Sequence, residues 1–160
     1  MDIPIPLPAR PPVASRTRAR RAVFFDVENS SRPEHVERLV EHLELASAGR
    51  ETQLLAVGNF RVVGHDTARM LARCGARLVH SAPMTGVKDW SDLRIAVEAG
   101  IWLASSTAGD VVEIVTDDQA FDAVGDVAAN RGVVFRRLSY RRVAGPASVV
   151  RRTRGPRSRR

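Results

Sequence analysis

The stretch RAVFFDVENS, residues 21–30, is typical of the first strand of a buried sheet and already carries polar side chains at its end. The apolar run Ala-Val-Phe-Phe favours a strand, and Asp26, Glu28 and Asn29 follow where that strand would stop. Such residues either close a strand with a turn or begin a functional site. The other segments of the chain have to decide between the two.

After this strand, helical and strand patterns alternate along the chain. Apolar residues at helical spacing predict helices at 31–49, 66–75, 89–105 and 119–132. Apolar runs predict further strands at 52–60, 76–82, 111–116 and 133–139. Strands that are apolar on both faces and alternate with helices predict an α/β fold with a parallel sheet covered on both sides. Right-handed crossovers then favour a three-layer α/β/α sandwich with a five-stranded parallel sheet in the order 3-2-1-4-5.

Charge is distributed unevenly over the 160 residues, although the net charge is +7. Residues 1–21 carry five arginines against one acid, and residues 141–160 carry eight arginines and no acid. The remaining 12 basic and 17 acidic side chains give residues 22–140 a net charge of −5. We therefore predict one folded domain at 22–140 between a disordered Pro/Arg-rich arm at 1–21 and a disordered Arg-rich tail at 141–160. Arginine-rich arms of this kind favour a nucleic-acid backbone as the partner.

Several classes of protein are disfavoured by composition. The apolar runs are too short to span a bilayer, and prolines interrupt any apolar leader at the N-terminus, so no membrane partner is expected. Cys74 is the only cysteine, and no Cys/His pair has zinc-ligand spacing. A cytoplasmic location is the prediction, and a homo-oligomer is compatible with the sequence.

Acidic residues recur at the predicted carboxyl ends of the strands, where parallel sheets place their sites. The fourth strand ends in Asp117 and Asp118, Asp122 follows, and Asp92 lies near the start of the helix at 89–105. In the order 3-2-1-4-5, Asp26 would face Asp117 or Asp118. Each acid could also simply cap a helix or close a turn. Carboxylates within about 4 Å repel by roughly 4 kcal/mol per pair, which favours neutralisation by protons or by a divalent cation. Oxygen ligands alone point to Mg²⁺ or Mn²⁺ as that cation.

Three motifs in this order resemble those of the NYN domains, relatives of the PIN-like nucleases that include the LabA-like proteins. FFDVENSS (24–31) resembles the opening Asp-x-x-Asn motif of that family. GVKDWSDLRIAVEAG (86–100) resembles its central helix, in which a lysine precedes an aspartate and a second acid, here Glu98, follows six residues later. IVTDDQAFDAVGD (114–126) resembles its motif after the fourth strand, usually Ser-Gly-Asp-x-Asp-Phe. The resemblance covers roughly residues 22–140.

The resemblance implies a PIN-like fold and a metal-dependent endoribonuclease that uses Mg²⁺ or Mn²⁺ to activate water for hydrolysis of RNA. It implies a catalytic and metal-binding triad of Asp26, Asp92 and Asp118. The residues that it assigns to substrate binding are Asn29 and Lys88, and the reserve metal ligands are Asp117 and Asp122. Glu98 lies about 120° around a helix from Asp92, so both side chains cannot point straight at one ion. Glu28 shares the side of Asp26 on the strand and matches no motif position.

The match also contains departures that leave other functions open. Asp117 replaces the usual glycine of the third motif, and Ala120 replaces its second aspartate. The chain could therefore be a catalytically inactive RNA-binding or scaffold module. A second alternative is a haloacid-dehalogenase-type phosphatase, with Asp26 as nucleophile, but Glu28 stands where that class has an aspartate.

Overall fold

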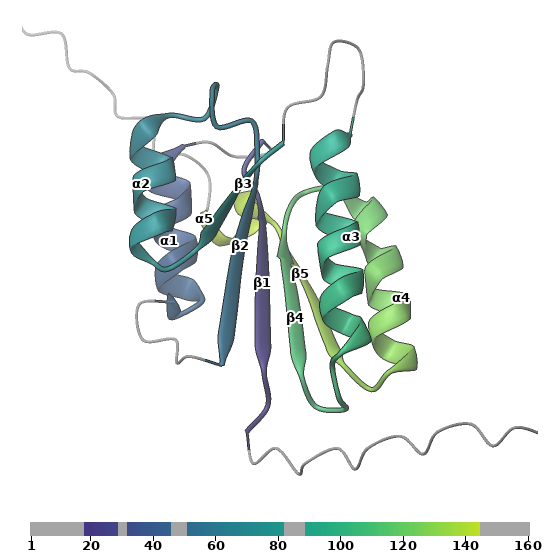
Figure 1. The fold of residues 1–160 in the computed structure, drawn as a ribbon. Helices are drawn as coiled ribbons and strands as arrows, with labels where there is room; N and C mark the ends of the chain where they lie inside the picture. Colours follow the sequence, from purple (N-terminus) through teal and green to yellow (C-terminus); the bar gives the residue numbers. More distant parts are fainter. Residues whose placement is uncertain (1–17, 29–31, 46–50, 82–88, 145–160) are drawn as a thin grey trace, which may run out of the picture.

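The computed structural model describes residues 18–28, 32–45, 51–81 and 89–144 (Figure 1). Its helices and strands alternate as the sequence predicts, with one addition, the short helix α5. In chain order they are β1 (Arg21–Asp26), α1 (Pro33–His42), β2 (Thr52–Gly58), α2 (His65–Arg73), β3 (Arg77–His80), α3 (Trp90–Ala104), β4 (Val111–Val115), the 3₁₀ helix η2 (Gln119–Phe121), α4 (Asp122–Asn130), β5 (Val134–Leu138) and α5 (Tyr140–Ala144). None of the helices in these ranges is long and apolar enough to cross a membrane.

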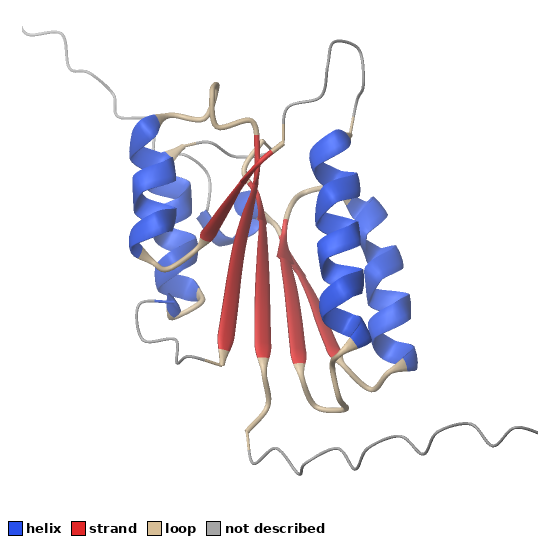
Figure 2. Cartoon of the chain, viewed as in Figure 1, coloured by secondary structure: helices blue, strands red, loops and turns tan. Residues whose placement is uncertain are grey.

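The five strands form one parallel sheet in the order β3-β2-β1-β4-β5. Helices α1 and α2 cover one face of this sheet and α3 and α4 cover the other, as Figure 2 shows. The predicted fold class, the three layers and the strand order are all confirmed. Because β1 is the central strand and all strands are parallel, its carboxyl end meets those of β2 and β4 at one edge of the sheet.

Alternation along β1 decides which side chains face which layer. Val23 and Phe25 pack in the core beneath α1 and α2, whereas Ala22 and Phe24 pack in the core beneath α3 and α4. All four side chains are fully buried. Asp26 is the next residue in the second series, so its carboxyl group is directed toward the α3 side of the sheet.

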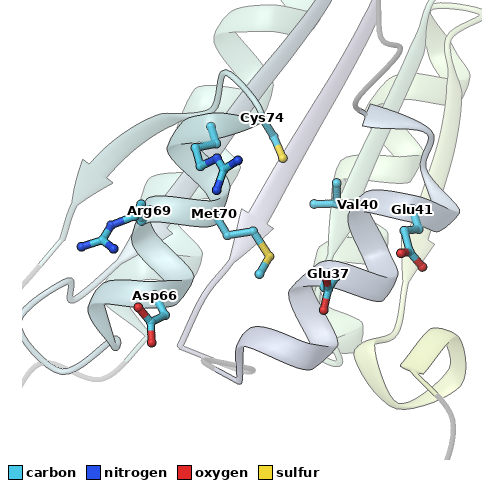
Figure 3. A pocket seen from close by; sticks show the side chains of 8 residues that line it. Glu37, Val40, Glu41, Asp66, Arg69, Met70 and Cys74 are labelled. Carbon is cyan, nitrogen blue, oxygen red and sulfur yellow. The ribbon is translucent and has the colours of Figure 1, made fainter.

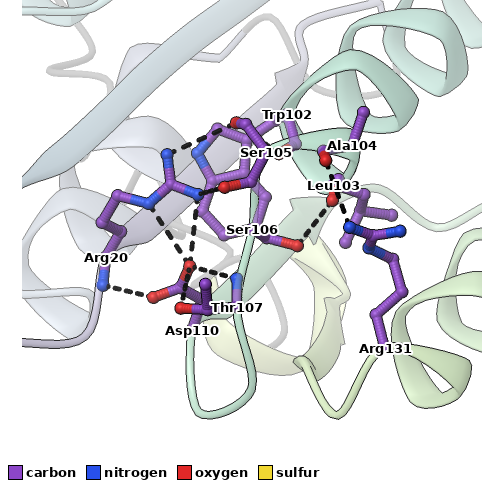
Figure 4. Close-up of polar contacts among 9 residues, drawn as sticks. All are labelled: Arg20, Trp102, Leu103, Ala104, Ser105, Ser106, Thr107, Asp110 and Arg131. Carbon is purple, nitrogen blue, oxygen red and sulfur yellow. Dashed lines mark hydrogen bonds and ion pairs between the residues drawn. The ribbon is translucent and has the colours of Figure 1, made fainter. Parts of the chain in front are cut away.

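The chain is anchored where it enters β1, at the edge of the sheet opposite the carboxyl ends (Figure 4). The Arg20 guanidinium donates to the buried Asp110 carboxylate at 3.2–3.3 Å and to the backbone oxygen of Ser105 at 2.6 Å. It also lies 5.1 Å from the ring centroid of Trp102. Burial alone would raise the pKa of Asp110, but hydrogen bonds from Thr107 and Arg20 and the Arg20 charge outweigh burial and lower that pKa.

Arg21 has a second buried acid as its partner, which shifts the predicted domain boundary. Its guanidinium lies 2.6 Å from Glu113, and Arg136 reaches the same carboxylate at 3.2 Å. Arg20 and Arg21 therefore belong to the folded domain and not to an arm, and residues 141–144 continue the domain as part of α5. The rest of the predicted arm and tail, at 1–17 and 145–160, lies outside the described residues, so their disorder remains a prediction.

Candidate active site

Asp26 lies at the carboxyl end of β1 and is fully buried. The hydroxyl of Thr116 donates to its Oδ2 atom at 3.0 Å, because the parallel pairing of β1 with β4 brings the residue after β4 alongside the end of β1. On the opposite side of the sheet, the Tyr140 hydroxyl donates to the backbone oxygen of Asp26 at 3.2 Å. Burial, together with the charges of Asp26 and Asp117, raises the pKa of Tyr140 well above its usual value, so the phenol keeps its proton.

Asp92 lies in the first turn of α3 and meets Asp26 across the α3–sheet contact. Burial is the largest of the causes that raise the pKa of Asp92 to about 7, followed by the charges of Asp26 and Asp118. A side-chain hydrogen bond between Asp92 and Asp26, and the charge of Asp89, raise it further. Near neutral pH the two carboxyl groups therefore share a proton for part of the time.

Asp118 connects to this pair through Thr116. The backbone N–H of Asp118 donates to Thr116 Oγ1 at 3.1 Å, and the same hydroxyl donates to Asp26. Asp118 has an extended backbone and caps η2, where its Oδ1 atom accepts from the backbone N–H of Ala120 at 2.9 Å. The structure thus brings Asp26, Asp92 and Asp118 together, within electrostatic reach of one another.

A groove opens beside these acids, between α3 and the segment formed by η2 and α4. It has a volume of about 280 Å³. Asp92 and Asp118 lie on its acidic side, and Phe121 and Val124 contribute apolar surface. Ala120, which stands where the family motif has an acid, also lines this groove. Asp92 and Asp118 are therefore accessible from solvent along a mainly apolar surface.

Asp117 is not part of the cluster. Its Oδ1 atom accepts from the hydroxyl of Ser139, and its Oδ2 atom lies 3.4 Å from Arg141 Nε. Ile114 packs on the α3 side of the sheet and Val115 on the other, so Thr116 takes the Asp26 side and Asp117 the α5 side. Of the two residues expected to face Asp26, Asp117 is directed away from it, and Asp118 is connected to it through Thr116.

Asp122 and Glu98 also have partners elsewhere. Asp122 is exposed, and its Oδ1 atom lies 2.8 Å from Arg137 Nε. Asp122 does not share a helical face with Asp118, because Asp118 precedes the helix in an extended conformation. Glu98 pairs with Arg77 at 3.0 Å and with Arg94 at 2.8 Å, in line with its expected position away from Asp92. The predicted substrate-binding residues, Asn29 and Lys88, lie outside the described residues.

Glu28 has a structural role that the sequence motifs did not assign. Its Oε2 atom accepts from the Ser91 hydroxyl at 3.0 Å, and its Oε1 atom accepts from the backbone N–H of Asn59 at 3.0 Å. Ser91 precedes Asp92, so Glu28 ties the first turn of α3 to the ends of β1 and β2. The segment of Val27 and Glu28 packs closely against the end of β2 because residue 58 is a glycine; a Cβ on Gly58 would lie 2.7 Å from Val27 Cγ2. The sequence feature that could have indicated this role is the position of Glu28, two residues after Asp26 and on the same side of the strand.

The carboxylate oxygens of the cluster are ligands of the kind that Mg²⁺ or Mn²⁺ prefers. Magnesium in proteins is commonly held by one or two carboxylates, with waters and substrate phosphates completing its coordination. The hydrogen-bonded pair of Asp26 and Asp92 supplies that number of carboxylates. Within the described parts of the chain, no three Asp, Glu, His or Cys side chains are placed to bind one ion. The geometry therefore fits a two-carboxylate site open to water, and the three-aspartate ligand set stays a prediction.

A larger hollow lies between α1 and α2, away from the acids (Figure 3). Acidic side chains, including Glu37 and Asp66, and basic ones, including Arg69, line it together. Cys74 also lines it, and burial raises the pKa of its thiol despite the nearby Arg73 charge. A protonated thiol beside three acidic and two basic side chains offers no reactive group, so the carboxyl edge of the sheet remains the candidate site.

Comparison with known proteins gives one positive finding. The family model described as the NYN domain matches residues 20–149, which includes all the described strands and helices. A search of curated proteins returns no match.

Proposed function

Because the chain belongs to the NYN domain family of PIN-like nucleases, we propose that it is a metal-dependent endoribonuclease. Its substrate is RNA, and its metal is Mg²⁺ or Mn²⁺. The observation that carries the proposal is the carboxyl pair of Asp26 and Asp92 at the carboxyl edge of the sheet, with Asp118 acting on it. These are the three acids that match the family motifs in sequence.

In this proposal Asp26 and Asp92 hold the metal, and Asp118 contributes through water or directly once RNA is bound. A bound divalent metal would lower the pKa of a water nucleophile and stabilise the charge of the phosphate. Thr116 fixes the orientation of the Asp26 carboxylate by its 3.0 Å hydrogen bond. Like-charged carboxyl groups are costly to ionise together, so a cation here relieves a repulsion that the fold otherwise offsets with a proton.

The remaining protein groups would act on the phosphate backbone. Asn29 would orient water or a phosphate, and Lys88 would neutralise a phosphate beside the metal. The arginines of residues 145–160 would hold the RNA strand, because α5, which precedes them, packs beside Asp26. These three roles complete the proposed mechanism.

Cleavage of single-stranded and structured RNA in Mn²⁺ tests the proposal. The wild type is expected to cut internally, and Asp26→Asn and Asp92→Asn are expected to lose at least about a hundredfold in rate, since each removes a metal ligand. Asp126→Asn is the matched control, because Asp126 is exposed on α4 and lies outside the cluster. Cleavage that persists at the wild-type rate in Asp26→Asn would not come from this site and would refute the proposal.

A second function has one observation in its favour. Ala120 leaves the third motif without its second acid, and it contributes only a backbone N–H to Asp118. A module that binds RNA without cutting would bind equally well as wild type and as Asp26→Asn. If neither protein cuts, and removal of residues 145–160 weakens binding of both, the module function replaces the endonuclease.

A further inference from the structure

The outward face of α3 is apolar, although α3 already buries its other side. Trp90, Leu93, Val97 and Ile101 expose 48%, 60%, 58% and 64% of their surface. On the opposite side of the helix, residues that include Ile95 pack into the core. A helix that is apolar on both sides is typical of one that is covered on both sides. Figure 1 shows α3 as an outer helix, with no described element in front of it.

The size of this face fits a small interface between two proteins. A shallow groove of about 450 Å³ runs along it. The four apolar side chains together expose on the order of 400 Å² per copy, which is comparable to the largest patch on a typical monomer. Two such faces, with the residues beside them, reach the roughly 1,000 Å² of total buried area that a specific interface requires.

The face is complementary to itself. Leu93, Val97 and Ile101 follow one another at intervals of four and form a ridge along the helix. A row of small residues, which includes the exposed Gly100 and Ala104, runs beside that ridge. Apart from the backbone of α3 itself and the two chain neighbours, no atom of the described residues lies within 4 Å of the position that a Cβ on Gly100 would occupy. In an antiparallel pair of α3 helices, the ridge of each copy fits the groove over the small residues of the other.

The charged residues along the outward face of α3 do not favour a partner other than a second copy of the chain. Among the described residues that line the groove, the charged ones are Arg94 and Glu98, and they pair with each other at 2.8 Å. An RNA strand would require basic side chains directed outward, and a charged protein partner would require a patch of one sign. A second copy of this chain requires neither.

We infer that the outward face of α3 joins two copies of this chain about a two-fold axis near Val97. Val97 then lies opposite Val97 of the second copy, and Leu93 lies opposite Ile101 of the second copy. The inference does not depend on the proposed nuclease activity. The small area predicts a dissociation constant on the order of micromolar.

Cross-linking through the axis is the first test. In a Cys74→Ser background the native thiol is removed, and Val97→Cys is expected to form a disulfide-linked dimer on mild oxidation, because only residues at the axis bring two Cα atoms within about 7 Å. Val134→Cys is the matched control, since Val134 is 44% exposed but lies on the edge strand β5. Equal cross-linking of both variants, or none of Val97→Cys, would overturn the inference.

Sedimentation equilibrium of the unmodified chain is the second test. The weight-average mass should rise toward that of a dimer with concentration, and Val97→Glu should hold it at the monomer value because two acids would meet at the axis. Val134→Glu should leave the dimer intact, and thermal melting should show both variants folded. A wild-type monomer up to about 200 µM, or a dimer that survives Val97→Glu, would exclude a second copy as the occupant.

Discussion

Metal binding at the carboxyl pair should depend on pH through Asp92. Burial and the charges of Asp26 and Asp118 hold the pKa of Asp92 at about 7 in the metal-free protein. A metal that uses this carboxylate must first displace its proton. With that pKa, about one molecule in ten has an ionised Asp92 at about pH 6, and about nine in ten at about pH 8. The dissociation constant for Mn²⁺ should therefore fall about tenfold across this range.

Mn²⁺ titration followed by electron paramagnetic resonance measures this dependence directly. Asp92→Asn should bind more weakly and lose the pH dependence, whereas Asp126→Asn should keep the wild-type curve. The stability of the metal-free protein should change with pH in the opposite direction to its Mn²⁺ affinity. Because folding raises the pKa of Asp92, protonation of Asp92 stabilises the folded state. This stabilisation is lost as pH rises from about 4 through about 7. A wild-type affinity that does not change between about pH 6 and about pH 8 would refute the role of Asp92 as a ligand.

Three further predictions test other parts of the structure. Glu28→Ala should weaken Mn²⁺ binding by about tenfold without removing a proposed ligand, because α3 loses its tie to the sheet; an unchanged affinity would contradict this. Asp110→Ala should lower the free energy of unfolding in urea by about 3 kcal/mol, since the buried Arg20 contact loses its acceptor, while Mn²⁺ affinity stays the same. Removal of residues 145–160, with six arginines, should reduce the salt slope of RNA binding by about 4, and removal of 1–17, with two, by about 1; equal reductions would show that charge count does not govern binding.

The fold could be predicted because its signals are local. Apolar runs such as residues 111–116 and the helical spacing of residues 89–105 each lie within one segment, and the parallel arrangement follows from their alternation. Helix α5 was missed because its five residues are too short to display a period. Tyr140 begins that helix and is fully buried only because the helix packs beside the end of β1.

The site was only partly accessible to the same reasoning. The alternation of Ala22, Phe24 and Asp26 places Asp26 on one face, and the same rule applied to β4 selects Thr116 and excludes Asp117. The choice of Thr116 over Asp117 therefore requires only the sequence and the predicted strand order. The raised pKa of Asp92 could not be predicted, because it depends on burial against the sheet and on two charges from other elements.

The hydrogen bonds that hold the cluster indicate how the fold tolerates it. Glu28 and Thr116 each bridge separate segments: Glu28 joins the ends of β1 and β2 to α3, and Thr116 joins Asp26 to the backbone of Asp118. Both bridges act on groups that hold or orient the acids, so they oppose separation of Asp26 and Asp92 when both are ionised. The repulsion is then relieved by a proton or by a cation and not by relaxation of the chain. An acidic pair held in this way would not have to be ordered before it binds a divalent ion, which favours the proposed metal-assisted hydrolysis.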